Sequence, residues 1–266
     1  MSGKTELAGI RMMRFARKAR VSTLRLLVLM AACFAIAVPA NAMQVSPLAV
    51  ELNVFNTGVG NQFTVSNDTN APLPLELSAA RITMDADGKV TEGAAGDQDL
   101  LILPIQATIP PGQTQNFRVQ YVGDPGIAQS QSYFVHVNQV PIKLPEGQSG
   151  VQMVYNFRVL ANVAPAAGAP SLSVESTSIS QAEGKSYPVV VVRNAGNVHA
   201  MLSFLPQLTI VQKNASGAEI FRKSFSTASS LELFGLGLVM PNSVRRFVLP
   251  VELPASSGTI SVGLGE

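Results

Sequence analysis

Apolar and polar side chains alternate along much of the chain, and this repeat constrains the fold more than any other feature. It is clearest in Gln62–Ser66, Phe117–Val122 and Tyr133–Val137. Since successive side chains of a β-strand point to opposite faces, a repeat of two residues predicts strands that are buried on one face. Residues 43–266 contain no apolar stripe with the helical repeat over three turns. The sequence therefore predicts an all-β fold.

Turn-forming residues interrupt these segments about every 8–12 residues, which is typical of a β-sandwich. They are Asn67–Asn70, Asp87-Gly88, Pro110–Gly112, Gly123–Gly126, Asn194–Asn197 and Asn214–Gly217. The uncharged, Pro- and Ala-rich stretch Val163–Pro170 predicts a linker. The segments on either side each have the length of one immunoglobulin-like sandwich, roughly 100 residues. We therefore predict two tandem immunoglobulin-like β-sandwich domains, residues 43–163 and 164–266.

Residues 1–42 predict a secretory signal peptide. A basic start is followed by the apolar run Leu26–Val38 and by Ala40-Asn41-Ala42, and these are the three parts of such a signal. The run is shorter than the roughly 20 residues of a membrane-spanning helix, although an uncleaved anchor is the alternative. Cleavage after Ala42 predicts an exported chain that begins at Met43.

Cys33, the only cysteine, lies within the apolar run. Met30–Cys33 loosely resembles a bacterial lipoprotein site, so lipidation is the alternative to its removal with the signal peptide. Removal of residues 1–42 leaves 19 − 7 = 12 basic and 17 − 1 = 16 acidic residues, a net charge of −4. The mature chain therefore has no basic excess for nucleic acid and no disulfide, and burial alone must stabilise it.

Reactive side chains are scarce after residue 42. His136 lies in a strand-like segment and predicts a strand-face residue, whereas His199 follows a turn and predicts a loop-edge residue. Neither has a partner at the spacing of a metal site, and the serine-hydrolase motif G-x-S-x-G does not occur. Met84–Gly88 hints at calcium, but it lacks the later Glu of an EF-hand, and Asp-Gly predicts a hairpin turn. We expect no enzyme, no metal and no cofactor.

The segment Val151–Leu160 has an unusually regular pattern. Its odd positions are all apolar, whereas its even positions are mixed. Periodicity alone favours a last strand of the first domain whose odd face packs into its own sandwich. The alternative is that part of this face binds another protein.

Several segments, taken in order, resemble the periplasmic chaperones that assemble pili. They are Phe63–Asp68, Leu103-Pro104, Ile109–Gln113, Asn116–Val119, Tyr133–Pro141 and Val151–Pro165, and more weakly Asn194–Asn197 and Val239–Phe247. The resemblance covers most of the first domain and is looser in the second. It implies a first domain whose last strand is partly exposed and completes a pilin subunit that lacks a strand, the mode called donor-strand complementation.

The resemblance also implies site residues and partners. The donor residues would be Val151, Met153 and Tyr155, with Phe157 as a further candidate. Burying four such side chains supplies about 5–10 kcal/mol before the costs of association. The implied function is a periplasmic chaperone that binds pilin-like subunits and delivers them to an outer-membrane usher. An exposed strand edge promotes aggregation, so a self-capping dimer is a hypothesis.

The chain departs from this family at charged positions. Family members hold the subunit's terminal carboxylate with a basic residue on the first strand and another on the last. Here these positions are Glu51 and Leu160, and the family's acidic residue between the domains corresponds to Ser130. Arg158 lies on the same strand face as Leu160 and is the candidate carboxylate anchor.

Two other functions remain open. A secreted structural or adhesive β-sandwich module without chaperone activity would explain everything except the chaperone-like segments. A carbohydrate-active enzyme would need paired carboxylates that face each other across a cleft, which the spacing of residues on strands does not show.

Overall fold

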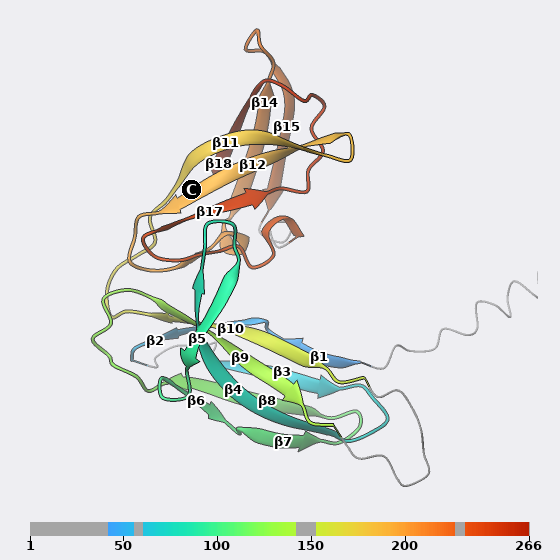
Figure 1. Ribbon diagram of the computed structural model, residues 1–266, viewed down its shortest axis with the longest axis vertical. Helices are drawn as coiled ribbons and strands as arrows, with labels where there is room; N and C mark the ends of the chain where they lie inside the picture. Colours follow the sequence, from blue (N-terminus) through green and yellow to red (C-terminus); the bar gives the residue numbers. More distant parts are fainter. Residues whose placement is uncertain (1–41, 56–60, 142–152, 227–231, 266) are drawn as a thin grey trace, which may run out of the picture. The chain divides into compact units, whose positions relative to one another are not determined.

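The computed structural model describes residues 42–55, 61–141, 153–226 and 232–265 (Figure 1). Nearly all of the regular structure is β-strand, which confirms the predicted all-β fold of two immunoglobulin-like sandwiches. The predicted signal peptide up to Asn41, with Cys33, and the donor candidate Val151 lie outside the described residues. Within the described ranges, no helix has the length and apolar character that a membrane span requires.

The first sandwich consists of β1–β10. One sheet has the strand order β1-β3-β8-β6, and the other has the order β2-β10-β9-β4-β5, with β7 also paired to β4. The bounds are β1 Met43–Ser46, β2 Ala49–Asn53, β3 Gln62–Asn67, β4 Leu73–Met84, β5 Val90–Ala95, β6 Leu100–Leu103, β7 Gln106–Ile109, β8 Thr114–Tyr121, β9 Gln131–Gln139 and β10 Asn156–Ala164.

Alternate side chains of both sheets form the core of the first sandwich. Phe63 on β3 and Phe117 on β8 are fully buried, and their stacked rings lie 5.4 Å apart between centroids. The repeat of two residues therefore placed apolar side chains on the inner faces of β3, β8 and β9, as the sequence predicted. The sheet that contains β10 packs on this core, which includes side chains of β10 itself.

The second sandwich has a core of its own. One sheet has the order β11-β12-β17 and the other β15-β14-β18, with a short pair β13-β16. The bounds are β11 Leu172–Ala182, β12 Lys185–Asn194, β13 Ala200–Met201, β14 Gln207–Lys213, β15 Glu219–Ser226, β16 Leu238–Val239, β17 Ser243–Val248 and β18 Thr259–Leu264, with a 3₁₀ turn at Leu202–Phe204. Since β10 ends at Ala164 and β11 begins at Leu172, the intervening residues connect the two sets of strands. The domain bounds given above, residues 43–163 and 164–266, remain predictions from the sequence.

The sequence correctly predicted a turn at Asp87-Gly88. It joins β4 to β5, and the Asp85 carboxylate accepts hydrogen bonds from the backbone N–H groups of Asp87 and Lys89, at 3.0 and 2.8 Å. Gly88 has a φ of +83°, a conformation that favours glycine. Asp85 therefore orders the turn itself, and the described residues contain no group of three His, Cys, Asp or Glu side chains that could hold a metal ion.

Tyr133 gives the first sandwich a pH dependence. Its buried hydroxyl donates to the Asp99 carboxylate at 2.8 Å; burial, followed by this hydrogen bond and the Asp99 charge, raises the pKa of Tyr133 far above its ordinary value. The unfolded chain ionises near pH 10 and the folded chain does not, so stability is fully present below about pH 10 and falls above it, by about 1.4 kcal/mol per pH unit. We expect Tyr133→Phe to flatten the decline in the free energy of unfolding between pH 10 and 11. Equal slopes in urea titrations of both proteins would contradict this.

Candidate functional site

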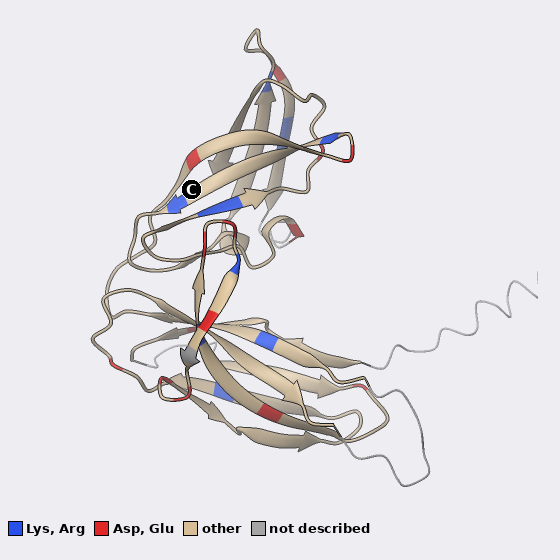
Figure 2. Cartoon of the chain, viewed as in Figure 1, with Lys and Arg blue, Asp and Glu red and all other residues tan. Residues whose placement is uncertain are grey.

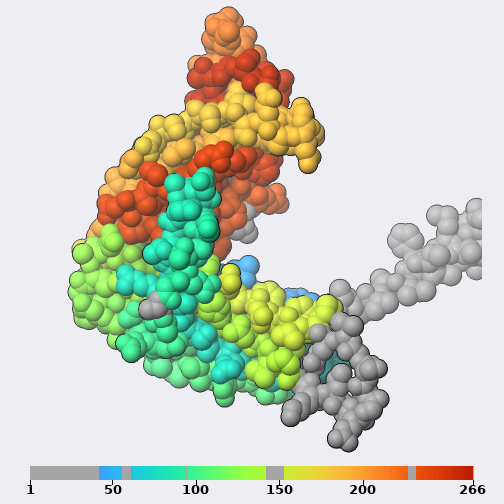
Figure 3. All heavy atoms as spheres, viewed as in Figure 1, coloured from blue at the N-terminus to red at the C-terminus, as the bar shows by residue number. Residues whose placement is uncertain are grey.

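The strand β10 is paired on both sides only in its second half. β9 pairs with Asn156–Val163, whereas the parallel partner β2 pairs only with Leu160–Ala164. The first strand of the sandwich switches sheets, because β1 pairs with β3 in the opposite sheet. Within the described residues, the β2-side edge of Asn156–Val159 therefore has no strand beside it. Figure 3 shows part of this strand, coloured yellow, at the molecular surface.

The backbone directions along β10 show which groups this open edge presents. The N–H of Leu160 donates to the carbonyl of Leu48 at 2.9 Å, on the β2 side. The carbonyl of Tyr155 accepts from the N–H of Gln139 at 3.0 Å, on the β9 side. Since strand residues alternate in the side to which their backbone groups point, Asn156 and Arg158 direct their N–H and C=O groups to the open edge. Such a row can pair with a strand of another chain.

Side chains on the odd face become more exposed toward the start of β10. Val159 is fully buried, and Tyr155 and Phe157 are partly buried against the core of the first sandwich. Met153 is 69% exposed. The odd face thus packs into its own sandwich along β10 and leaves it before the strand begins.

The strand itself starts later than predicted. The sequence indicated a strand over Val151–Leu160, but β10 begins at Asn156, and Met153 lies before it. The physical reason is the loss of partners, because β2 does not reach this far and the pairing with β9 ends near Tyr155. The alternation of apolar side chains continues on both sides of Asn156, so the sequence pattern does not indicate where strand pairing ends.

Arg158 projects from the other face of β10 and already has a partner. Its Nε lies 3.4 Å from Oε1 of Glu92 on β5, and its guanidinium lies 5.6 Å from the centre of the Phe134 ring. The second oxygen of Glu92 lies 3.1 Å from Nε2 of His136, which occupies the strand face that the sequence predicted. Charged residues are sparse on β9 and β10 (Figure 2). The carboxylate of Glu92 therefore lies opposite the main positive group of this region, the guanidinium of Arg158.

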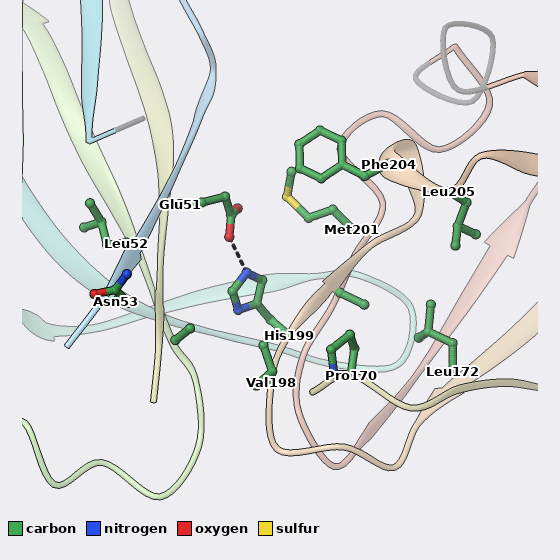
Figure 4. Close-up of a pocket in the computed structure, with 12 residues that line it drawn as sticks. Glu51, Leu52, Asn53, Pro170, Leu172, Val198, His199, Met201, Phe204 and Leu205 are labelled. Carbon is green, nitrogen blue, oxygen red and sulfur yellow. Dashed lines mark hydrogen bonds and ion pairs between the residues drawn. The ribbon is translucent and has the colours of Figure 1, made fainter. Parts of the chain in front are cut away.

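A second polar cluster, which the sequence did not predict, surrounds Glu51 on β2. Its carboxylate lies 2.5 Å from Nε2 of His199 (Figure 4) and accepts from the side-chain amide of Asn162 at 2.9 Å. Nδ1 of His199 lies 3.0 Å from Oγ of Ser130. His199 lies in the loop directly before β13, where the sequence predicted a loop-edge residue, but its side chain is buried and has a polar partner at each ring nitrogen.

The carboxylate of this cluster decides which ring nitrogen of His199 donates. Ionised Glu51 can only accept, so the ring donates from Nε2, and in this neutral tautomer Nδ1 accepts from the Ser130 hydroxyl. The same hydroxyl accepts from the backbone N–H of His199 at 3.1 Å. The order of Ser130, His199 and Glu51 resembles that of a hydrolase triad. However, Ser130 is 5% exposed, and both its donor and its acceptor capacity serve His199. The arrangement holds residues together and offers no accessible nucleophile.

Comparison with known proteins gave structural matches only. No protein-family model and no curated protein sequence matches the chain. The class 5 fimbriae chaperone CfaA aligns at 14% identity over 85% of this chain and 99% of that one, with a TM-score of 0.46. The Escherichia coli chaperone DraB aligns at 16% identity, 79% and 86% coverage and a TM-score of 0.42.

A third match is a structure of the CsuC–CsuE chaperone and tip subunit complex from Acinetobacter baumannii, at 11% identity, 81% and 94% coverage and a TM-score of 0.44. Chaperones of fimbriae and pili are thus among the solved structures that this chain resembles across most of its length, as the sequence segments suggested. Because these identities and TM-scores are low, we base the functional proposal on the chain's own geometry.

Proposed function

We propose that the chain is a periplasmic chaperone that binds pilin-like subunits by donor-strand complementation and delivers them to an outer-membrane usher. The observation that supports this proposal is the open edge of β10 beside Met153. An open edge supplies backbone hydrogen bonds, and an exposed apolar side chain in line with it supplies contact area. A subunit that lacks one strand needs both.

The parts of the donor segment would have different roles. Asn156 and Arg158 would pair their backbone groups with an edge strand of the subunit. Met153 and Tyr155 would fill its open groove, and Phe157, which contacts the chaperone's own core, would support them. Val151 would extend the series by one position. Burial of Met153 alone contributes about 1.5–3 kcal/mol.

Further parts of the proposal come from the sequence. Residues 1–42 would direct export and be removed after Ala42, so that Cys33 leaves with them. The mature chain would consist of a donor-strand domain, residues 43–163, and a second domain, residues 164–266. In the absence of a subunit, two chains could cap each other's open edges as a dimer, because an unpaired edge favours pairing.

Co-expression with a candidate subunit tests the proposal. The chain and a pilin-like protein from the same genome would be produced together and recovered from the periplasm by an affinity tag on the chaperone. We expect a complex with one subunit per chaperone and protection of that subunit from proteolysis. A folded chaperone that retains and protects none of the candidate subunits of its genome would contradict the proposal and favour the structural-module alternative.

The role of Arg158 as carboxylate anchor leads to a prediction about its neighbour. If Arg158 binds the subunit's terminal carboxylate, Glu92 competes for the same guanidinium. We expect Glu92→Gln to tighten binding of the subunit about threefold and Arg158→Ala to weaken it by a similar factor, since both groups are partly exposed to solvent. Dissociation constants from calorimetry would measure both effects.

The exposed pair Arg193 and Glu175 on the second sandwich, with a distance of 2.7 Å, supplies the matched control. Arg193→Ala and Glu175→Gln should leave the dissociation constant unchanged. If Arg158→Ala behaves in the same way, Arg158 is not the anchor.

A further inference from the structure

A pocket with a volume of about 540 Å³ opens beside Glu51 (Figure 4). Its wall is mainly apolar, and in Figure 4 the side chains of Met201, Phe204 and Leu205 lie around it. Phe204 is 62% exposed and gives the pocket an apolar rim. The volume lies within the range of pockets that bind small ligands or side chains, about 300–1,000 Å³.

Glu51 contributes the carboxylate to this lining, and no lysine or arginine is among the lining residues. Two N–H donors, from His199 and Asn162, hold the carboxylate in place. A carboxylate has about four acceptor positions, so two remain. The Glu51 side chain is 41% exposed, and the remaining positions can therefore accept from a ligand. The pocket thus combines a fixed negative group with apolar walls.

We propose that this pocket binds a lysine or arginine side chain, flanked by apolar residues, of the partner subunit. The identity of the partner rests on the proposed function; the preference for a cation rests on the pocket alone. One carboxylate is too few oxygen ligands for Ca²⁺, which takes about six to eight. An alkyl ammonium or guanidinium group instead uses both features, since its stem contacts Phe204 and its charged end reaches Glu51.

Three blocked peptides test the charge preference on the mature protein. They are acetyl-Ala-Leu-X-Leu-Ala-amide with lysine, norleucine or glutamate as X. In titrations followed by NMR, we expect the lysine peptide to bind about fivefold more tightly than the norleucine peptide, with the glutamate peptide the weakest. Glu51→Gln keeps the size of the side chain, and it should bring lysine and norleucine within twofold. Equal binding of lysine and norleucine by the wild-type protein would overturn the proposal.

A second pair of variants tests whether the peptides bind in this pocket, independently of any structural effect of Glu51→Gln. Phe204→Ser should weaken the lysine and norleucine peptides equally, because it removes wall area and leaves Glu51 in place. Phe55→Ser is the matched control, since Phe55 is also 62% exposed but does not line the pocket; it should change neither affinity. If Phe204→Ser has no effect, the peptides do not occupy this pocket and the proposal is wrong.

The same variants distinguish a failure of the cation-binding proposal from a failure of the proposed chaperone function. When subunit capture is intact and Glu51→Gln leaves both capture and peptide preference unchanged, the chaperone function stands and the cation site is refuted. When every candidate subunit fails to bind but the lysine preference disappears with Glu51→Gln, the proposed function is refuted and the cation site stands without its partner.

Discussion

If the proposed function is right, Met153→Asp should abolish capture of the subunit while leaving the protein folded. Met153 is 69% exposed and precedes β10, so a charge there changes the free energy of unfolding by no more than about 0.5 kcal/mol. In a donor-strand complex, the same side chain would be buried in an apolar groove. An uncompensated aspartate would lose the burial energy and add a desolvation cost of several kcal/mol. We expect a reduction in affinity of at least 100-fold, measured as loss of co-purification and by calorimetry.

Val248→Asp provides the control, because Val248 on β17 is an exposed aliphatic residue of the second sandwich, at 46% exposure. It should leave capture unchanged. Tyr155→Asp is a poorer test, since Tyr155 also packs against the core and its loss would reduce stability. Capture that survives Met153→Asp at wild-type affinity would contradict the donor-strand proposal.

The backbone of the open edge can be tested separately. Proline removes an N–H group, and the N–H of Asn156 points to the open edge, whereas that of Phe157 points to β9. Asn156→Pro should therefore weaken capture and spare the ladder with β9, as prolines on free strand edges do. Phe157→Pro should reduce the thermal stability of the protein itself. Equal effects of both variants on stability would mean that the two edges do not differ as inferred.

The alternation of apolar residues predicted the strands of the first sandwich because burial on one face is a local property of the sequence. Gln62–Ser66 and Tyr133–Val137 fall within β3 and β9 as predicted. The open edge was not predictable in this way. It depends on where the parallel strand β2 begins beside β10, with Ala49 opposite Leu160. The alternation of apolar residues contains no information about the pairing of strands more than 100 residues apart.

The cluster around Glu51 shows the same limit for polar residues. Glu51 and His199 are separated by 148 residues, and the spacing of either in sequence indicates nothing about the other. The only signal was indirect: Glu51 and Ser130 stand where the pilus chaperones that the sequence resembles have residues of different charge. Those departures pointed to an altered site, but the histidine that bridges Glu51 and Ser130 became visible only in the fold.

Phe117→Ala should cause a large loss of stability in the first sandwich. Its ring is fully buried and stacks on Phe63 between the two sheets. Removing it leaves a cavity and costs about 3–5 kcal/mol, a large part of the total of about 5–15 kcal/mol that stabilises a domain. Urea titration should show a lower midpoint with an unchanged slope.

The consequence reaches the candidate site, because Val159 on β10 packs in the same core. Phe55→Ala, at a 62% exposed position, should stay within about 0.5 kcal/mol of the parent. The double variant with Phe63→Ala should lose less than the sum of the single losses, since the stacked pair contributes about 0.5–1.5 kcal/mol that each substitution removes once. A loss below about 1 kcal/mol for Phe117→Ala, well under the range for a buried aromatic ring, would show that the two rings do not form the packed centre of this sandwich. The support that β10 receives from them would then have to come from elsewhere.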